Sequence, residues 1–403
     1  MPFLSSCCPA AGFCDSLVTG VSEAGVVGMQ TVDSIIIGGG VVGLAVAAEL
    51  ARKFPCRSIA LLERNGACGQ ETSSRSSEVI HAGIYYAAGS LRARLCVEGK
   101  TLLYQFCRRW DVPHRRIGKL IVAKSTEEAA TLDGLMNSGR LNGVDDLELL
   151  DRRQAQALEP HVEAISAVWS PSTGIIDSHG LTARLAWCAA QLGATVACRH
   201  EVIGIDKAAD GYAVCFLGPD GTKEYLRSSW VVNCAGLGAE HIAAYAGIDT
   251  ADAGYRLYFC KGEYFRIPLS KGHLVEHLVY PPPYKDLLGL GIHVTKSLDG
   301  MTKLGPNAFY VDRLDYDVDP GHAREFYDGT KDYLPFLSRD DLHPDTAGIR
   351  PKLQAPGAPA RDFVIRHEAD KGLPGFINLI GIESPGLTSC LAIGNMVAAM
   401  IEL

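Results

Sequence analysis

The chain has 403 residues, 47% of them hydrophobic and 21% charged, a composition typical of a globular protein with room for two domains. Its 38 basic and 46 acidic residues give a formal net charge of −8 and form no long basic run, which argues against a nucleic-acid partner. The 13 cysteines include no Cys-x-x-Cys pair and no apolar run reaches the roughly 18 residues of a membrane span, which predicts a reducing compartment, no metal site and no transmembrane segment.

The first 30 residues differ in composition from the rest of the chain. They are rich in Ser, Cys, Gly and Ala and contain no Lys or Arg, whereas transit peptides are usually Arg-rich and poor in acidic residues. Asp15 and Glu23 depart further from that pattern. We expect residues 1–30 to be a disordered leader and a weak targeting signal.

A strand, a glycine-rich turn, a helix and a second strand follow Met29 in that order. The apolar, β-branched run Val32–Ile37 predicts the first strand, and Leu44–Lys53 predicts a helix with apolar faces. Ser58–Glu63 predicts the second strand, and the whole unit has the length of a βαβ crossover.

Two further strand-loop-helix units lie far downstream. The strand Ser229–Cys234 precedes a helix that starts at Ala239–Tyr245, and the strand Phe376–Ile380 precedes the helix Leu387–Ile401. Three such returns predict an α/β fold with one Rossmann-like, doubly wound domain assembled from separated segments.

The stretches between these units contain Pro-bearing loops, short strands and aromatic residues. We therefore assign 111–175 and 255–345 to a second, mostly antiparallel domain of the α+β type that would hold the substrate. Residues 31–110, 176–254 and 346–403 are assigned to the dinucleotide-binding domain.

The turn after the first strand carries the fingerprint Gly38-x-Gly40-x-x-Gly43. In such a turn the first glycine allows a tight bend, the second lets the backbone approach a pyrophosphate, and the third lets helix and strand pack closely. Glu63 lies 20 residues beyond Gly43, where a carboxylate can accept hydrogen bonds from ribose hydroxyls. The alternatives are a glycine turn without a ligand and, for a bound dinucleotide, FAD or NAD.

A hydroxyl-rich loop follows at residues 71–77. Thr72, Ser73, Ser74 and Ser76 surround Arg75, a grouping that suits the phosphate and ribityl groups of a cofactor. The alternative is an exposed polar loop.

Together with these motifs, eight stretches carry a resemblance to a known family. They are Val79–Tyr86, Ser90–Cys96, Ile175–His179, Lys261–Tyr264, Gly291–Thr295, Leu304–Ala308, Gly348–Lys352 and Gly381–Ser389. The chain resembles the L-2-hydroxyglutarate dehydrogenase/oxidase family of the D-amino-acid-oxidase-like flavoprotein superfamily. The resemblance extends over residues 32–395, and it implies a mitochondrial protein in a eukaryote and a cytoplasmic one otherwise.

The resemblance implies FAD as the cofactor. Glu63 would hold the adenosine ribose, the backbone of Val202 would contact the adenine, and Gly236 would lie near the pyrophosphate. The helix N-terminus at residues 386–388 would stabilise the negative charge of reduced flavin. The expected cofactor-binding residues are Gly38, Gly40, Val41, Val42, Gly43, Glu63, Arg64, Thr72, Ser73, Ser74, Arg75, Ser76, Val202, Ala235, Gly236, Arg350, Gly386, Leu387, Thr388 and Ser389.

A 2-hydroxy acid needs a cation for its carboxylate and a base for its hydroxyl proton. Arg350, in Gly-Ile-Arg-Pro, is the expected carboxylate clamp, and its alternative role is a structural ion pair. Lys261 could hold a second carboxylate, with a solvated lysine as the alternative.

The candidate bases are His81 and His293, because the ordinary imidazole pKa of roughly 6.5 suits general base catalysis. We assign the base to His293 and an orienting role to His81, although either could be a core histidine. Tyr85, Tyr86, Tyr264 and Tyr280 are expected to orient the substrate, with simple packing as the alternative.

The expected reaction is oxidation of L-2-hydroxyglutarate to 2-oxoglutarate by hydride transfer from C2 to flavin N5. The alternatives are an amine or amino-acid oxidase of the same superfamily, and a non-catalytic flavoprotein that acts through a protein partner. The sequence leaves open whether the electron acceptor is quinone, electron-transfer flavoprotein or oxygen.

Overall fold

The computed structural model describes residues 29–283 and 291–402, so most of the predicted leader lies outside the described residues. Within these ranges the chain forms one sheet of eight strands, one of nine and one of three. No helix in the described part of the chain is both long and apolar enough to cross a membrane.

The centre of the eight-stranded sheet is parallel. Its strands lie in the order β9 (Thr195–Cys198), β2 (Ile59–Glu63), β1 (Gln30–Ile37), β12 (Lys223–Asn233) and β20 (Phe376–Ile380). Strands β1, β12 and β20 come from the start, middle and end of the chain, which confirms the predicted doubly wound arrangement of separated segments.

On its edge away from β1, the long strand β12 divides its pairing between two neighbours. Its first half pairs antiparallel with β11 (Gly211–Leu217), which pairs in turn with β10 (Glu201–Ala208). Its last residues pair with β20, and β20 also pairs antiparallel with β19 (Val364–His367). The parallel core therefore carries antiparallel strands at one edge.

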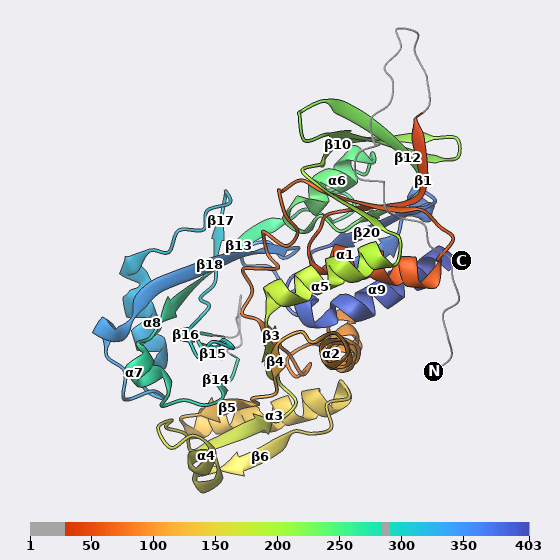
Figure 1. The fold of residues 1–403 in the computed structure, drawn as a ribbon. Helices are drawn as coiled ribbons and strands as arrows, with labels where there is room; N and C mark the ends of the chain where they lie inside the picture. Colours follow the sequence, from red (N-terminus) through yellow and green to blue (C-terminus); the bar gives the residue numbers. More distant parts are fainter. Residues whose placement is uncertain (1–28, 284–290, 403) are drawn as a thin grey trace.

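Helices cover both faces of this sheet. Apolar residues of α1 (Val41–Lys53), α5 (Ser178–Gln191), α9 (Gly386–Glu402) and α2 (Leu91–Trp110) form one core with alternate residues of the parallel strands (Figure 1). The other alternate residues pack with α6 (Ala239–Tyr245) and strands β10–β12. This alternation is the side-chain period of a strand buried on both faces.

Two glycines allow this close helix packing. A Cβ at Gly43 of α1 would lie 2.0 Å from the carbonyl oxygen of Gly38, and one at Gly394 of α9 would lie 2.9 Å from that of Ala45. Because no side chain fits at either position, α1 can approach both its own strand and α9.

The nine-stranded sheet is antiparallel except for the pair β14–β5, as predicted for a mostly antiparallel second sheet. Its strand order is β17-β13-β16-β15-β14-β5-β7-β6, and β18 pairs with β13. The strands are β5 (Lys119–Ala123), β6 (Glu148–Asp151), β7 (Ser166–Ser170), β13 (Tyr258–Arg266), β14 (Leu278–Tyr280), β15 (Val294–Lys296), β16 (Thr302–Leu304), β17 (Phe309–Val311) and β18 (His343–Lys352).

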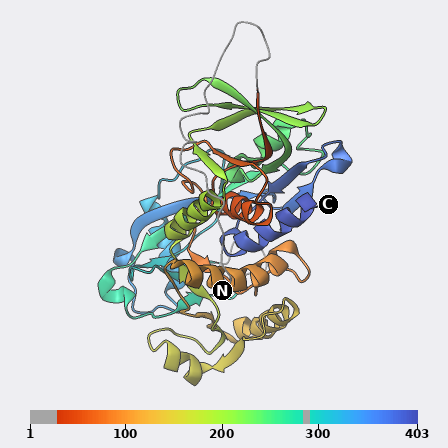
Figure 2. The same cartoon turned by 45° about the vertical axis from the view of Figure 1, so that its right-hand side comes forward.

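The remaining elements join or flank the two large sheets. Helices α3 (Thr126–Leu141) and α4 (Arg152–Leu158) adjoin β5–β7, and α7 (Leu269–Gly272) and α8 (Ala323–Thr330) adjoin the other end. Figure 2 shows α2 between the layer of α1 and α9 and the segment of α3. The small sheet holds β3 (Val79–Ile80), β8 (Gly174–Ile176) and β4 (His114–Arg115), and the 3-10 turns are η1 (Gly236–Gly238), η2 (Pro320–His322), η3 (Arg339–Asp341) and η4 (Ala369–Lys371).

The predicted domain boundary at residue 346 falls inside β18, because this strand pairs with β13 along nearly its whole length. Residues 284–290 of the predicted second domain lie outside the described residues. The division of the chain into domains stays a prediction.

Candidate active site

Two adjoining cavities open at the carboxyl ends of the parallel strands. The smaller has a volume of about 240 Å³ and the larger about 490 Å³. They share part of their lining, so that together they form one elongated site, as expected for a ligand at the switch point of a doubly wound sheet. The shared residues are Gly40, Thr72, Ser73, Cys234 and Gly236.

The glycine fingerprint forms the wall where the two cavities meet. Gly38 has φ +106°, and a Cβ there would lie 2.5 Å from the carbonyl oxygen of Cys234. Gly40 borders both cavities and caps α1 without a side-chain hydrogen bond, while the next amide, that of Val41, donates to Ser73 Oγ at 3.1 Å. The N-terminus of α1 therefore faces the cavity with the partial positive charge that favours a phosphate.

The smaller cavity is organised around Glu63, which is 7% exposed. The backbone amides of Gly39 and Asn65 each donate a hydrogen bond of 2.7 Å to its carboxylate. Each oxygen retains a lone pair, so the carboxylate can still accept hydrogen bonds from ribose hydroxyls. The other predicted cofactor residues in this lining are Gly38, Arg64, Val202 and Ala235.

The hydroxyl-rich loop lies between the two cavities. Arg75 and Ser76 line the larger cavity, and the guanidinium of Arg75 lies 3.9 Å from the ring centroid of Tyr316. Ser74 lines neither cavity, and its hydroxyl donates to the carbonyl oxygen of Glu71. The helix residue Gly43 and the buried Ser389 also lie outside both linings.

At the far end of the larger cavity, α9 begins at Gly386. Gly386, Leu387 and Thr388 line the cavity, so the helix N-terminus points at it. Thr388 Oγ1 accepts a hydrogen bond of 3.0 Å from the backbone amide of His81. The helix thereby fixes the segment that carries the first candidate base.

Both histidines line the larger cavity and are nearly inaccessible to solvent, His81 being 8% and His293 5% exposed. Burial, with a further contribution from Lys119, lowers the pKa of each to about 3. His293 Nδ1 donates to the carbonyl oxygen of Gly291 at 2.7 Å, which leaves its Nε2 with a free lone pair. Both imidazoles are therefore neutral, and His293 Nε2 can accept a proton.

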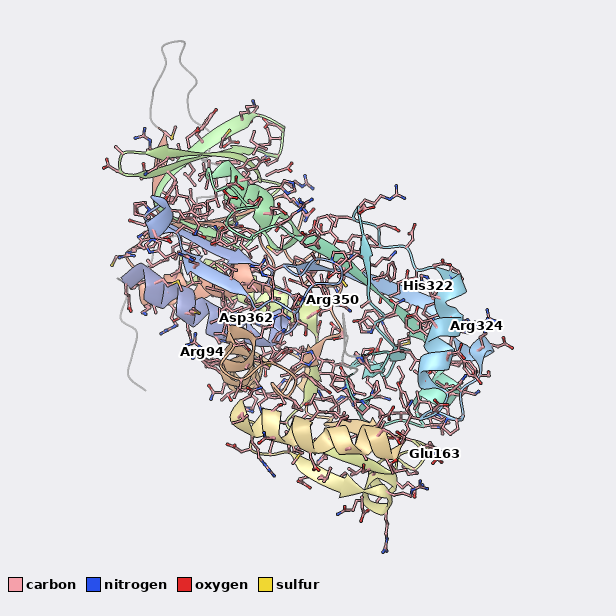
Figure 3. The ribbon with its side chains drawn as sticks, turned by 180° about the vertical axis from the view of Figure 1, so that it is seen from behind. Arg94, Glu163, His322, Arg324, Arg350 and Asp362 are labelled. Atoms are coloured by element: carbon pink, nitrogen blue, oxygen red, sulfur yellow. The ribbon has the colours of Figure 1, made fainter. Side chains whose placement is uncertain are left out.

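Arg350 lies near the middle of the molecule and faces the same cavity (Figure 3). Its guanidinium donates to Cys260 Sγ at 3.6 Å and to the carbonyl oxygen of Asn307 at 3.4 Å. Among the described residues, no carboxylate lies within 4.0 Å of the Arg350 guanidinium, the limit for an ion pair. The guanidinium can therefore receive a carboxylate from a ligand.

The four predicted tyrosines, Tyr85, Tyr86, Tyr264 and Tyr280, all line the larger cavity. Burial raises the pKa of all four phenols, which keeps their hydroxyls protonated and able to donate. The ring of Tyr280 stacks on His293 with a centroid distance of 3.7 Å.

Lys261 does not line either cavity, so the structure does not bring it to the predicted position. Its ammonium lies 3.3 Å from Asp315 and 3.5 Å from Glu263, and it donates to the carbonyl oxygen of Asp317. The charge of Lys261 is thus already neutralised within the protein.

Sequence reasoning missed two groups at this site. Lys119 is 1% exposed and its ammonium lies between the rings of Tyr85 and Tyr280. Glu383 accepts from Arg92 at 2.8 Å and Lys352 at 3.0 Å, and all three line the larger cavity. A lysine at the start of the apolar run Leu120–Ala123 was the available signal for the first group.

Comparison with known proteins gives the family. The model of the DAO family, FAD dependent oxidoreductase, matches residues 33–400. The mitochondrial L-2-hydroxyglutarate dehydrogenase of Arabidopsis thaliana is 37% identical, with 95% of this chain and 86% of that protein covered. Its Homo sapiens counterpart is 31% identical, with 92% of this chain and 88% of that protein covered.

Solved structures share the fold. The L-alpha-glycerophosphate oxidase of Mycoplasma pneumoniae, solved with FAD bound, has a TM-score of 0.82 at 27% identity and covers 93% of this chain and 96% of its own. Glycine oxidase of Geobacillus kaustophilus has a TM-score of 0.75 at 21% identity, covering 93% and 94%, which shows the fold alone. This chain therefore belongs to the FAD-dependent oxidoreductase family and, within it, to the L-2-hydroxyglutarate dehydrogenase family.

Proposed function

We propose that this protein oxidises L-2-hydroxyglutarate to 2-oxoglutarate with FAD as its cofactor. The observation that carries the proposal is the meeting of a guanidinium without a carboxylate partner, Arg350, and a neutral imidazole, His293, in one cavity. That cavity adjoins the smaller cavity beside the glycine fingerprint, and the two together form the elongated site.

The residues present fit FAD along the whole channel. Glu63 would accept from the adenosine ribose, and the N-terminus of α1 at Gly40 would face the pyrophosphate. Gly236 has φ +55° and nothing within 4 Å of a would-be Cβ, so the cofactor can approach its backbone. The N-terminus of α9 at Gly386 would face the flavin ring. Bound FAD would supply the acceptor for the hydride that leaves substrate C2.

The protein's own part in the reaction is to hold the substrate and to take its proton. Arg350 would bind the C1 carboxylate through a charge-assisted pair of hydrogen bonds. His293 Nε2 would accept the proton of the C2 hydroxyl as the C2–H bond breaks and the carbonyl forms. His81, whose backbone amide donates to Thr388 at the N-terminal end of α9, would orient the substrate.

The same cavity could hold the amino group of an amino acid in place of a hydroxyl, so the substrate is decided by turnover. Purified FAD-loaded protein is mixed anaerobically with a panel of 2-hydroxy acids and amino acids while the flavin absorbance is followed. We expect bleaching by L-2-hydroxyglutarate. Bleaching by amino acids alone would assign the protein to the amino-acid oxidases, and no bleaching by any member would indicate a non-catalytic flavoprotein.

Reoxidation requires an acceptor, and we propose that it is quinone, electron-transfer flavoprotein or oxygen. Mixing reduced protein with each acceptor in turn and following the return of flavin absorbance distinguishes the three. The relatives named above are described as mitochondrial, and on this ground we propose a mitochondrial location for a eukaryotic source.

A further inference from the structure

The proposed substrate has two carboxylates, and Arg350 accounts for only one of them. Lys261, the predicted partner of the other, is paired with acidic residues outside the cavity. Lys119 is a buried basic residue beside the cavity, at the start of β5 between β7 and β14. It is 1% exposed.

The ammonium of Lys119 has no anionic partner among the described residues. It lies 4.5 Å from the ring centroid of Tyr85 and 4.7 Å from that of Tyr280. The titratable groups that interact with it are His81, His293 and the thiol of Cys96, none of which is anionic at neutral pH. A buried ammonium without an anion is unfavourable, so a negative charge brought in by a ligand would stabilise this position.

The hydroxyls of the two tyrosines that flank Lys119 also lack hydrogen-bond partners. The hydroxyl oxygens of Tyr85 and Tyr280 are buried and form no hydrogen bond within the described part of the chain. Both residues line the larger cavity, which Lys119 itself does not. Since burial keeps both phenols protonated, they are two unused donors in front of one unpaired ammonium. That arrangement matches an oxyanion.

We propose that the hydroxyls of Tyr85 and Tyr280, backed by the charge of Lys119, bind the second carboxylate of the substrate and select dicarboxylic over monocarboxylic 2-hydroxy acids. The assignment rests on the proposed function. Tyr85 and Tyr280 touch the carboxylate, and Lys119 is a positioning residue that acts through them.

The test compares two substrates of equal length. Anaerobic flavin reduction is measured with L-2-hydroxyglutarate and with L-2-hydroxypentanoate, which has a methyl group where the former has its second carboxylate. Lys119→Met is expected to lower kcat/KM for the dicarboxylate by about tenfold to a hundredfold, the usual effect of losing a charge-assisted contact. The value for the monocarboxylate should change less than threefold. Tyr85→Phe and Tyr280→Phe, which keep the rings and remove one oxygen each, should act in the same direction.

Lys261→Met is the matched control, because it also replaces a buried lysine by methionine but outside the cavity. It should leave the ratio of the two kcat/KM values unchanged. Equal loss with both substrates in Lys119→Met, or loss of selectivity in Lys261→Met instead, overturns the assignment. FAD content measured on each variant confirms that the protein is folded.

Binding of unreactive acids tests the subsite without turnover. Glutarate and pentanoate are titrated against the FAD-loaded protein by flavin absorbance. Burial lowers the pKa of Lys119 to about 7, and only its protonated form attracts an anion. Glutarate binding should therefore weaken by up to tenfold per unit as pH rises above 7, and Lys119→Met should remove this dependence. Pentanoate binding should not change in this way.

Failure of the subsite and failure of the proposed function give different results. If L-2-hydroxyglutarate does not reduce the flavin but glutarate binds with the dependence described, the reaction is wrong and the subsite stands. If L-2-hydroxyglutarate reduces the flavin but glutarate binds no more tightly than pentanoate, the subsite is wrong and the reaction stands.

Discussion

At the scale of single residues, burial determines the chemistry of the candidate base. From the sequence, His293 was expected to have the ordinary imidazole pKa, but the surroundings hold it at about 3. The residue type and its neighbours could be read from the chain, whereas stacking by Tyr280 and the nearby charge of Lys119 depend on contacts between segments far apart in sequence. The sequence therefore identifies the candidate and the fold determines its protonation.

Replacing His293 by Ala should slow flavin reduction by roughly 10² to 10⁴, the usual contribution of a general base. FAD content should remain, because no cofactor role is proposed for this side chain. His343→Ala, which removes an exposed histidine of β18, is the control and should reduce its flavin at the original rate. Stopped-flow absorbance measures all three proteins. Should His81→Ala be slow and His293→Ala fast, the two assigned roles are exchanged.

The pH dependence of flavin reduction follows from the two lowered pKa values. Because His81 and His293 are neutral above a pH of about 3, the rate with a monocarboxylic substrate should be flat from pH 5 to 8. In the unfolded chain these histidines take up a proton at a pH of roughly 6.5, whereas in the folded protein they stay neutral. The free energy of unfolding therefore falls as pH falls from that value toward 3. Single-turnover rates and urea midpoints across this range check both points. A tenfold rise in rate centred near pH 6.5 would show an unperturbed base.

At the scale of secondary structure, the strands and helices of the parallel sheet were predictable and their ends less so. β20 and the start of α6 were placed at Phe376 and Ala239, where the structure has them. The helix predicted from Leu44 instead begins at Val41. Two valines and Gly43 are poor helix formers, so propensity favours a later start, whereas in the fold Gly43 packs closely against Gly38 in this first turn.

Replacing Gly40 by Val at the N-terminus of α1 should prevent the protein from binding FAD. A Cβ there already lies 3.0 Å from Ser73 Oγ, and the larger side chain extends into the space at the junction of the cavities. We expect folded but colourless protein, checked by the ratio of flavin to protein absorbance. Gly134→Ala in α3, where nothing lies within 4 Å of the new methyl group, should stay yellow. Retention of a full flavin complement by Gly40→Val would contradict the placement of the pyrophosphate.

At the scale of the whole molecule, the site depends on pairs that local sequence patterns could not reveal. Lys261 meets Asp315 and Asp317, more than 50 residues away, and this pairing holds it outside the cavity linings. Lys119 of β5 meets Tyr280 of the neighbouring strand β14, 161 residues away in the sequence. Motifs locate residues along the chain, but ion pairing and burial follow from the completed fold.

One such long-range group is the buried carboxylate of Glu383, which joins Arg92 of α2 to Lys352 of β18. Glu383→Gln would leave two cations without an anion and should lower the free energy of unfolding by about 3 kcal/mol. The more exposed pair of Glu402 and Lys53 is the comparison. Glu402→Gln should change the free energy of unfolding by less than about 1 kcal/mol. Urea unfolding followed by fluorescence measures both, and equal effects would argue against a structural role for Glu383.

The most direct test of the whole account is anaerobic titration of the FAD-loaded protein with L-2-hydroxyglutarate. The arrangement of Arg350 and His293 predicts that the flavin is bleached and that one 2-oxoglutarate forms for each flavin reduced. Flavin that stays oxidised with L-2-hydroxyglutarate, but is bleached by an amino acid under the same conditions, would contradict the proposed reaction.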